Sequence, residues 1–213
     1  MTRNRFFGLL AATLLFRFWL AAALPITGDE AYFIWWGKIP DWGFYDHPPM
    51  IGWWLAALLK VSDAEWWLRL PATLLPGVMA WATARVFKAQ GEQVAWGAAT
   101  LVLLSPLKVW NVIVTTDTAL IYFSFFSALA FLRAARDDDW RYYGVAGLLL
   151  GGAVLSKYFA ALLGFAYLVH ALIRPNPRKW GGLALCYAMV LPALLLMAWW
   201  NAGHCWPNYM FNF

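Results

Sequence analysis

Several ionisable side chains stand beside strongly apolar stretches of this chain. Lys157 lies between two apolar runs. Asp29 and Glu30 follow the first apolar run, and Asp117 precedes a later one. Ionisable groups at membrane depth usually mark a binding site or a pathway. A carboxylate in a partly dry cavity can take a proton from a hydroxyl group, and a lysine can hold a phosphate. These residue types suit a transfer in which an acceptor hydroxyl attacks and a phosphate leaves.

Each of these residues also has an ordinary explanation. Lys157 could lie at a helix end with its ammonium group extended to the membrane surface. Asp29, Glu30 and Asp117 could be capping acids, because acids suit a helix N-terminus. For these four residues the functional and the structural interpretations both stay open.

The segment Tyr45-Asp46-His47-Pro48-Pro49 is not explained by capping. Its two prolines restrict the backbone and predict a rigid turn, which would present Asp46 and His47 in a defined direction. Positive charge on His47, Lys157 or Arg69 could hold a phosphate.

The composition is that of a membrane protein. Hydrophobic residues make up 63% of the 213 residues and charged residues 13%, against about 45–50% and about 25% in soluble domains. Disordered, collagenous and disulfide-rich secreted proteins are excluded by the same numbers. Although the net charge is +5, Lys and Arg cluster between apolar runs, so we expect membrane lipids and no nucleic acid as partners. Cys186 and Cys205 have no Cys or His partner at zinc-type spacing, so we expect two free thiols and no metal site built on them.

Hydrophobic run lengths predict an all-α integral membrane protein with about seven spans, since a spanning helix needs about 20 apolar residues and about 17 can suffice. Their ranges are 6–26, 66–86, 94–114, 118–132, 142–155, 158–173 and 180–200. The first range could instead be a signal peptide, because residues 1–5 are basic and 21–23 resemble a cleavage site. Arg17 and the hydrophobic chain that follows favour a retained span.

The fifth and sixth ranges could alternatively form one long helix. Basic clusters at 133–141 and 174–179 flank the pair, and both clusters should face the cytoplasm. That requires an even number of crossings between them, so the charges favour two short helices.

The same rule places the N-terminus inside and the C-terminus outside. The sequence contains no internal repeat, low-complexity tract or linker, so we expect residues 1–213 to form a single multi-spanning membrane domain. Between the first two spans, residues 29–38 and 49–60 are predicted to be helices that are too short to cross and lie in the outer interface. The polar candidates then collect at the outer side: Asp29, Glu30, Asp46, His47, Arg69, Asp117, Lys157 and His204.

The order of these motifs resembles the N-terminal membrane portion of bacterial GT-C glycosyltransferases, the relatives of protein mannosyltransferases and aminoarabinose transferases. The resemblance begins with Asp29-Glu30-Ala31-Tyr32, Asp46-His47-Pro48-Pro49 and the sequence Trp-Leu-Arg-Leu-Pro at 67–71. It continues with a second acidic motif at 116–120, a lysine motif at 155–158 and a segment at 200–206 that resembles one bacterial branch.

The resemblance implies transfer of a sugar from a polyprenyl-phosphate donor to a lipid, glycan or protein acceptor. The reaction would take place at the periplasmic face of the bacterial inner membrane. Asp29 and Asp117 would be the catalytic acids. The donor phosphate and the substrate would be bound by Lys157, His47, Asp46, Glu30, Tyr32, Arg69 and His204. No cofactor is assigned, and a divalent metal requirement stays open. Family members usually continue through further spans, so these residues would be the first part of a longer protein.

Two other classes of protein stay open. A transporter or flippase would favour repeated halves and charged or unwound elements near the membrane midplane, which are not visible in the sequence. A non-catalytic membrane scaffold, or an inactive fragment, would not need acids, a histidine and a lysine on one side of the membrane.

Overall fold

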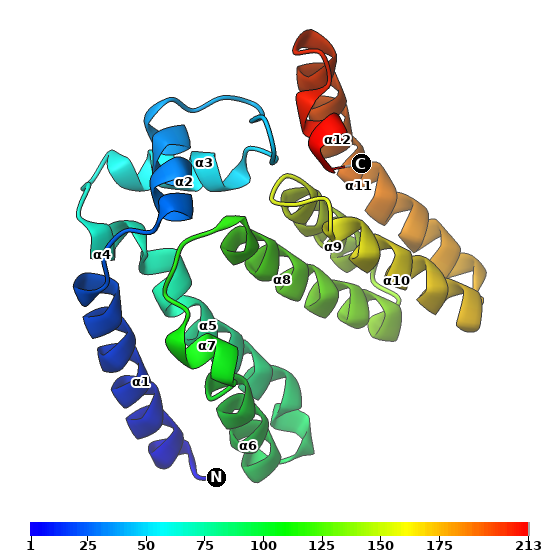
Figure 1. Ribbon diagram of the computed structural model, residues 1–213. Helices are drawn as coiled ribbons and strands as arrows, with labels where there is room; N and C mark the ends of the chain where they lie inside the picture. The colour runs from blue at the N-terminus through cyan, green and yellow to red at the C-terminus, as the bar shows by residue number, and fades with distance from the viewer. Residues whose placement is uncertain (213) are drawn as a thin grey trace. The chain divides into compact units, whose positions relative to one another are not determined.

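A computed structural model describes residues 1–212, and every regular element in that range is a helix. The helices belong to two compact units (Figure 1). Unit 1 comprises Met1–Tyr32 and Leu58–Val114. Unit 2 comprises Phe33–Ala57 and the chain from Thr115 onward.

Unit 1 is built on helices that meet through small and apolar residues. Its elements are α1 (Arg3–Ala23), the start of α2 (Gly28–Lys38), α4 (Glu65–Leu68), α5 (Leu70–Val86), the 3₁₀ turn Phe87–Gln90, α6 (Glu92–Leu103) and α7 (Pro106–Trp110). A buried cluster joins α1, α5 and α6 and consists of Phe6, Ala80, Ala84, Ala99 and Leu103. Alanines at these contacts let the helix backbones approach closely.

Arg17, in the middle of α1, is buried among backbone carbonyl groups. Its Nη2 donates to the carbonyls of Ala72 at 2.6 Å and Asn111 at 2.7 Å, and its Nε donates to that of Thr73 at 2.8 Å. Pro76 inside α5 has no N–H, so the Ala72 carbonyl lacks its usual helical partner. Arg17 therefore binds a carbonyl that a proline has freed, which explains how an arginine fits within an apolar helix.

The predicted helix over 94–114 is wrong in its second half. Helix α6 ends at Leu103, and Ser105 has the extended ψ of 125° that a following proline favours. Pro106 then begins the short helix α7, and Asn111 is again extended. The proline divides what hydropathy alone treats as one continuous span.

Unit 2 contains a bundle of four helices with shorter helices at one end. Its elements are the rest of α2, most of α3 (Met50–Leu59), α8 (Thr116–Asp137), α9 (Trp140–Val154), α10 (Ala160–Ile173), α11 (Pro177–Gly203) and α12 (Pro207–Asn212). Phe131 of α8 stacks on Tyr167 of α10, with ring centroids 3.9 Å apart. A Cβ at Gly147 of α9 would overlap the carbonyl of Cys186 of α11, so these two helices touch backbone to backbone.

The prediction of two short helices in place of one long helix is confirmed. Helix α9 ends at Val154, helix α10 begins at Ala160, and the intervening turn contains Lys157. The two short helices predicted near the start of the chain are also present, as α2 and α3.

Among residues 1–212, three helices are long and apolar enough to cross a membrane: α1, α8 and α11. Shorter apolar helices, α3 and α10, accompany them. Large apolar side chains such as Leu15 on α1 and Leu195 on α11 are exposed, at 73% and 66%. Exposed apolar surface of this kind suits lipid contact. The structure thus supports a helical membrane protein, and the count of about seven spans stays a prediction.

Candidate active site

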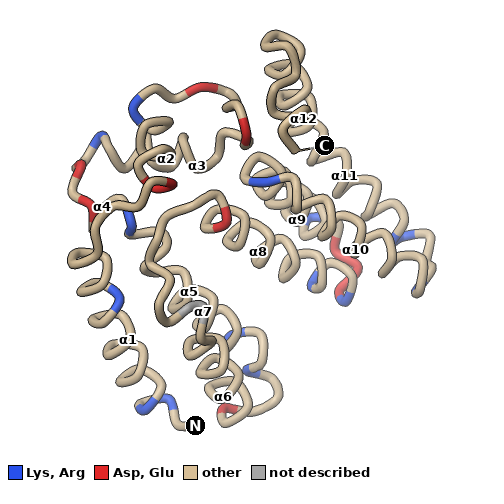
Figure 2. Tube along the Cα trace, viewed as in Figure 1, with Lys and Arg blue, Asp and Glu red and all other residues tan. Residues whose placement is uncertain are grey.

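An ion pair between Lys157 and Asp117 is the centre of the candidate site in unit 2. Lys157 Nζ lies 2.9 Å from Asp117 Oδ1, although the residues are 40 positions apart in sequence. Their side chains are 25% and 53% exposed. Figure 2 shows the basic residue in the α9–α10 turn and the acidic residue at the start of α8. An ion pair this exposed contributes about 0–1 kcal/mol to stability, so a ligand can displace either partner at low cost.

Asp117 is not needed to cap α8, because two threonines form the cap. The backbone N–H of Thr115 donates to Thr118 Oγ1 at 3.2 Å within a capping box. Asp117 stands between them on the first turn, where the helix dipole favours a negative charge. Its carboxylate therefore stays available to Lys157.

The Asp46–His47 turn lies in the same unit, directly before α3. His47 Nδ1 is 3.4 Å from Asp46 Oδ2, and the Phe44 N–H donates to the His47 carbonyl at 3.1 Å. The first N–H of α3, at Met50, donates to the carbonyl of Leu155 at 3.0 Å. This hydrogen bond ties the turn that carries Asp46 and His47 to the turn that carries Lys157.

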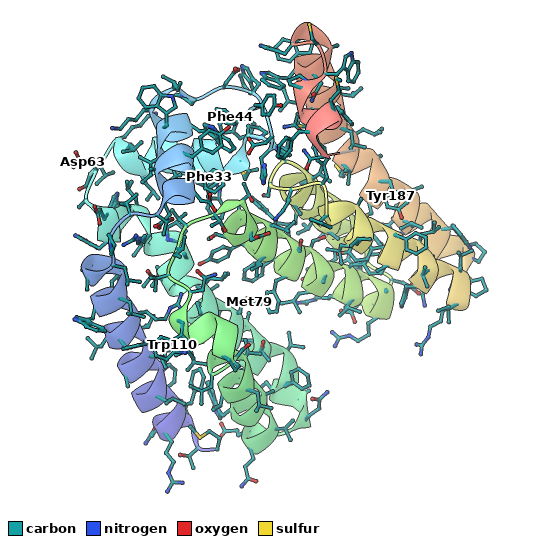
Figure 3. All side chains as sticks on the ribbon, in the orientation of Figure 1. Phe33, Phe44, Asp63, Met79, Trp110 and Tyr187 are labelled. Carbon is teal, nitrogen blue, oxygen red and sulfur yellow. The ribbon has the colours of Figure 1, made fainter. Side chains whose placement is uncertain are left out.

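Aromatic rings support the Asp46–His47 turn. Phe44 stacks on Trp36 of α2 with centroids 4.2 Å apart, and Phe33 packs edge-on against Trp36 at 4.9 Å. Figure 3 labels Phe33 and Phe44 in this cluster. The His47 ring lies 6.2 Å from the rings of both Phe33 and Trp36.

His204, the last predicted site residue of unit 2, is exposed where α11 ends. Its ring stacks on Trp200 at 4.2 Å, and its Nδ1 lies 2.7 Å from the Trp200 carbonyl. These contacts hold the imidazole against the end of its own helix.

In unit 1, Glu30 and Arg69 form an ion pair that is fully buried. Arg69 Nη2 and Nε donate to the two carboxylate oxygens at 2.7 and 2.8 Å, and both side chains are 0% exposed. The guanidinium also donates to the carbonyls of Ala21, Leu24 and Pro25 at the end of α1. The pair therefore fixes the connection between α1 and α2.

The ionisation of Glu30 follows from these partners. Burial alone would raise the pKa of the carboxyl, but the Arg69 guanidinium and the backbone N–H groups of Thr27 and Val114 reverse that effect. The pKa of Glu30 is consequently below its usual value, because these hydrogen bonds favour the ionised carboxylate. The pair is charged at neutral pH.

Glu30 also completes a capping box, so the capping interpretation holds for this acid. Its carboxylate accepts from the Thr27 N–H at 3.2 Å, and Thr27 Oγ1 accepts from the Glu30 N–H at 3.3 Å. Asp29 lies between them and is exposed, as is Tyr32 one turn later. Asp29 therefore has the same place in its capping box as Asp117 has in the second one.

The structure brings some predicted site residues together and leaves others apart. Lys157, Asp117, Asp46, His47 and His204 belong to unit 2, whereas Asp29, Glu30, Tyr32 and Arg69 belong to unit 1. That Asp29 and Asp117 line one recess stays a prediction. Within residues 1–212, no group of three or more His, Cys, Asp or Glu side chains could hold a metal ion.

Sequence reasoning missed the residues that hold the Asp46–His47 turn from outside. Asn208 of α12 donates from Nδ2 to the Phe44 carbonyl at 2.7 Å, and Asn212 donates to the Asp46 carbonyl at 2.8 Å. The only available signal was a pair of asparagines four residues apart after Pro207. That spacing places both on one helix face.

Comparisons with known proteins identify the family of this chain. A family model described as dolichyl-phosphate-mannose-protein mannosyltransferase matches residues 46–200. The chain is 28% identical over 182 residues to the lipid A galacturonosyltransferase RgtD of Rhizobium johnstonii, covering 83% of this chain and 38% of that protein. The chain thus spans well under half of that relative's length, and no solved structure matches it. Because the family model matches residues 46–200, well over half of the chain, the chain belongs to the dolichyl-phosphate-mannose-protein mannosyltransferase family.

Proposed function

We propose that the protein is a membrane glycosyltransferase that moves a sugar from a polyprenyl-phosphate donor to an acceptor. The observation that carries the proposal is the half-exposed ion pair between Lys157 Nζ and Asp117 Oδ1. A buried and saturated pair would have no capacity for a ligand. This one offers an ammonium group that can exchange a carboxylate for a phosphate.

The reaction requires little acid catalysis on the leaving side. The bond between the sugar C1 and the phosphate oxygen breaks, and the phosphate keeps the electron pair. Lys157 stabilises the charge that develops on that phosphate. The acceptor hydroxyl oxygen forms the new bond to C1 and loses its proton to a carboxylate base. Asp29, exposed on the first turn of α2, is proposed as this base, and Asp117 as its partner acid.

The remaining candidates take supporting roles in the proposal. His47, Asp46 and His204 bind the phosphate or the sugar from the same unit as Lys157. Glu30 and Arg69 are proposed to act through the backbone, because their buried pair holds the start of α2 and so presents Asp29 and Tyr32.

The acceptor is a lipid, a glycan or a protein. The relative is called a lipid A galacturonosyltransferase, which favours a lipid acceptor. We further propose a bacterial inner-membrane location with about seven spans, the N-terminus inside and the site facing the periplasm. The basic clusters at 133–141 and 174–179 lie at the ends of α8 and α10 that are remote from Asp117 and Lys157, as this orientation requires.

The test replaces the lysine in the full-length protein. Lys157→Met keeps the apolar stem and removes the charge, and Lys60→Met makes the same change at an exposed lysine that follows α3. Transfer is measured in membranes supplied with a radiolabelled polyprenyl-phosphate sugar. We expect Lys157→Met to lower transfer by about a hundredfold or more, with normal membrane insertion, and Lys60→Met to leave it unchanged.

Arginine at position 157 sharpens the test. If the lysine only extends to the membrane surface, Lys157→Arg should retain transfer, because both side chains reach the interface and stay charged. If Lys157 holds a phosphate in a shaped recess, the planar guanidinium should fit poorly. Transfer at the wild-type rate by Lys157→Met would overturn the assignment.

A further inference from the structure

Two side chains of the short helix α12 donate hydrogen bonds to the backbone of the segment that carries Asp46 and His47. Asn208 Nδ2 donates to the Phe44 carbonyl at 2.7 Å, and Asn212 Nδ2 donates to the Asp46 carbonyl at 2.8 Å. Asn208 is 0% exposed, so its hydrogen bond is made away from water. One face of α12 therefore holds two carbonyls on either side of Tyr45.

Two contacts with aromatic rings also join this segment to the C-terminal helices. The Tyr45 and Phe211 rings lie edge-on at 5.6 Å. A Cβ at Gly43 would overlap the Trp200 ring, so the end of α11 lies directly against the start of the segment. Only glycine permits this close approach at position 43.

The turn between α11 and α12 is strained. Cys205 and Trp206 have φ values of 62° and 60°, in the left-handed region that residues with a Cβ disfavour. The Trp206 N–H donates to the Asn201 carbonyl at 2.9 Å, which closes the turn. Strain of this kind persists only where the surrounding structure holds it, and it is concentrated at functional sites.

The other end of the segment is already fixed. Pro48 and Pro49 restrict the backbone after His47, and the Met50 N–H is bonded to the Leu155 carbonyl. On its N-terminal side, at residues 43–46, the segment is held by the stacking of Phe44 on Trp36 and by contacts from the C-terminal part of the chain. That is the side that α12 and Trp200 contact.

We propose that α12, folded back by the strained turn at Cys205 and Trp206, is a clamp that positions Asp46 and His47, and that Asn208 is its main positioning residue. The inference rests on the proposed function, since it assumes that Asp46 and His47 bind substrate. It gives a role to residues 201–212, which lie beyond the family match at 46–200. Asn208 acts through the backbone of Phe44 and touches no substrate itself.

The first measurement concerns the clamp alone and needs no activity. Asn208→Asp removes the amide donor with almost no change in volume, and Asn4→Asp makes the same change at an exposed position of α1. Hydrogen–deuterium exchange of the full-length protein in nanodiscs reports on residues 43–49. We expect exchange there to rise in Asn208→Asp and to stay unchanged in Asn4→Asp.

Two variants of Cys205 keep the proposal testable if the Asn208→Asp protein misfolds. Cys205→Gly keeps the left-handed turn without its strain, so residues 43–49 should stay protected. Cys205→Val places a β-branched residue where φ is positive, which is strongly disfavoured, so protection should fall. Unchanged exchange in both Asn208→Asp and Cys205→Val would overturn the clamp, whatever the protein catalyses.

The kinetic measurement separates positioning from mere packing. If the clamp positions Asp46 and His47, Asn208→Asp should raise the KM for the polyprenyl-phosphate sugar by about tenfold, with kcat changed less, and Cys205→Gly should retain the wild-type KM. Faster exchange with an unchanged KM would overturn the positioning role and leave the Lys157 proposal intact. A wild-type protein that transfers no sugar would overturn the proposed function, while the exchange data would still decide the clamp.

Discussion

Two ion pairs, one in each unit, use the same chemistry in opposite surroundings. In unit 1, Glu30 and Arg69 are both 0% exposed and meet at 2.7 Å. In unit 2, Lys157 and Asp117 meet at 2.9 Å with side chains 25% and 53% exposed. The first pair has its hydrogen-bonding groups occupied by backbone partners, whereas the second is open to solvent. Burial, and not residue type, therefore separates a pair that holds the fold from a pair that can bind a ligand.

The two capping boxes make the same distinction on a smaller scale. The box before α2 pairs Thr27 with Glu30 around Asp29, and the box before α8 pairs Thr115 with Thr118 around Asp117. In each box the outer residues satisfy the helix start, and the aspartate between them keeps its carboxylate free for another partner. In each box, the residues that cap the helix are therefore different from the aspartate that is proposed to act in catalysis.

The largest expected effect is a loss of stability when one partner of the buried pair is removed. Arg69→Met leaves the Glu30 carboxylate buried without its cation and leaves the carbonyls of Ala21, Leu24 and Pro25 without a donor. Removing one partner of a buried pair costs about 3–5 kcal/mol. We expect that loss in the free energy of unfolding, measured by denaturation of the purified protein in detergent.

A double variant shows whether the loss comes from the uncompensated charge. Glu30→Gln combined with Arg69→Met removes both charges, and buried pairs replaced as a whole are often close to neutral in stability. The double variant should therefore be more stable than Arg69→Met alone. Equal stability of the two proteins would mean that the Arg69 hydrogen bonds to α1, and not the ion pair, dominate.

The second effect falls on activity and leaves stability nearly unchanged. Asp117→Asn keeps the shape of the side chain and removes the charge that faces Lys157. We expect sugar transfer to fall by about a hundredfold, or about 2.7 kcal/mol, with a change in unfolding free energy below about 1 kcal/mol. Asp63→Asn, at an exposed aspartate of unit 1, is the matched control. A parallel loss of stability and transfer would make this pair structural, like the first.

Much of the fold follows from the sequence because hydrophobic run length and flanking charge act locally. The break between α9 and α10 at Lys157 was predicted from the basic clusters on either side. The predicted topology placed Asp117 and Lys157 on the same side of the membrane, so the sequence predicted that these two residues lie close together.

What the sequence did not predict depends on backbone groups distant along the chain. Arg17 counted as an interruption of a span, yet it binds a carbonyl that Pro76 frees in another helix. Arg69 and Glu30 were candidates for substrate binding because sequence gives residue type and not burial. The hydrogen bond of Asn208 to Phe44 spans 164 residues and involves a carbonyl group, which no side-chain pattern records.

The smallest expected effect is the pH dependence of the stability that Glu30 contributes through the buried pair. The pKa of Glu30 in the folded protein lies below its ordinary value of 4.5, because hydrogen bonds from Arg69 and the backbone outweigh burial. A carboxyl with a depressed folded pKa contributes stability that is fully present above its unfolded pKa and is lost as the pH falls through the folded one. Wild type should therefore lose stability below about pH 4.5, whereas Glu30→Gln lacks this contribution at every pH. The gap in melting temperature between the two proteins should narrow as the pH falls from about 5 to about 3, measured by thermal unfolding in detergent. A gap that stays constant over that range would mean that Glu30 does not owe its stabilising role to its charge.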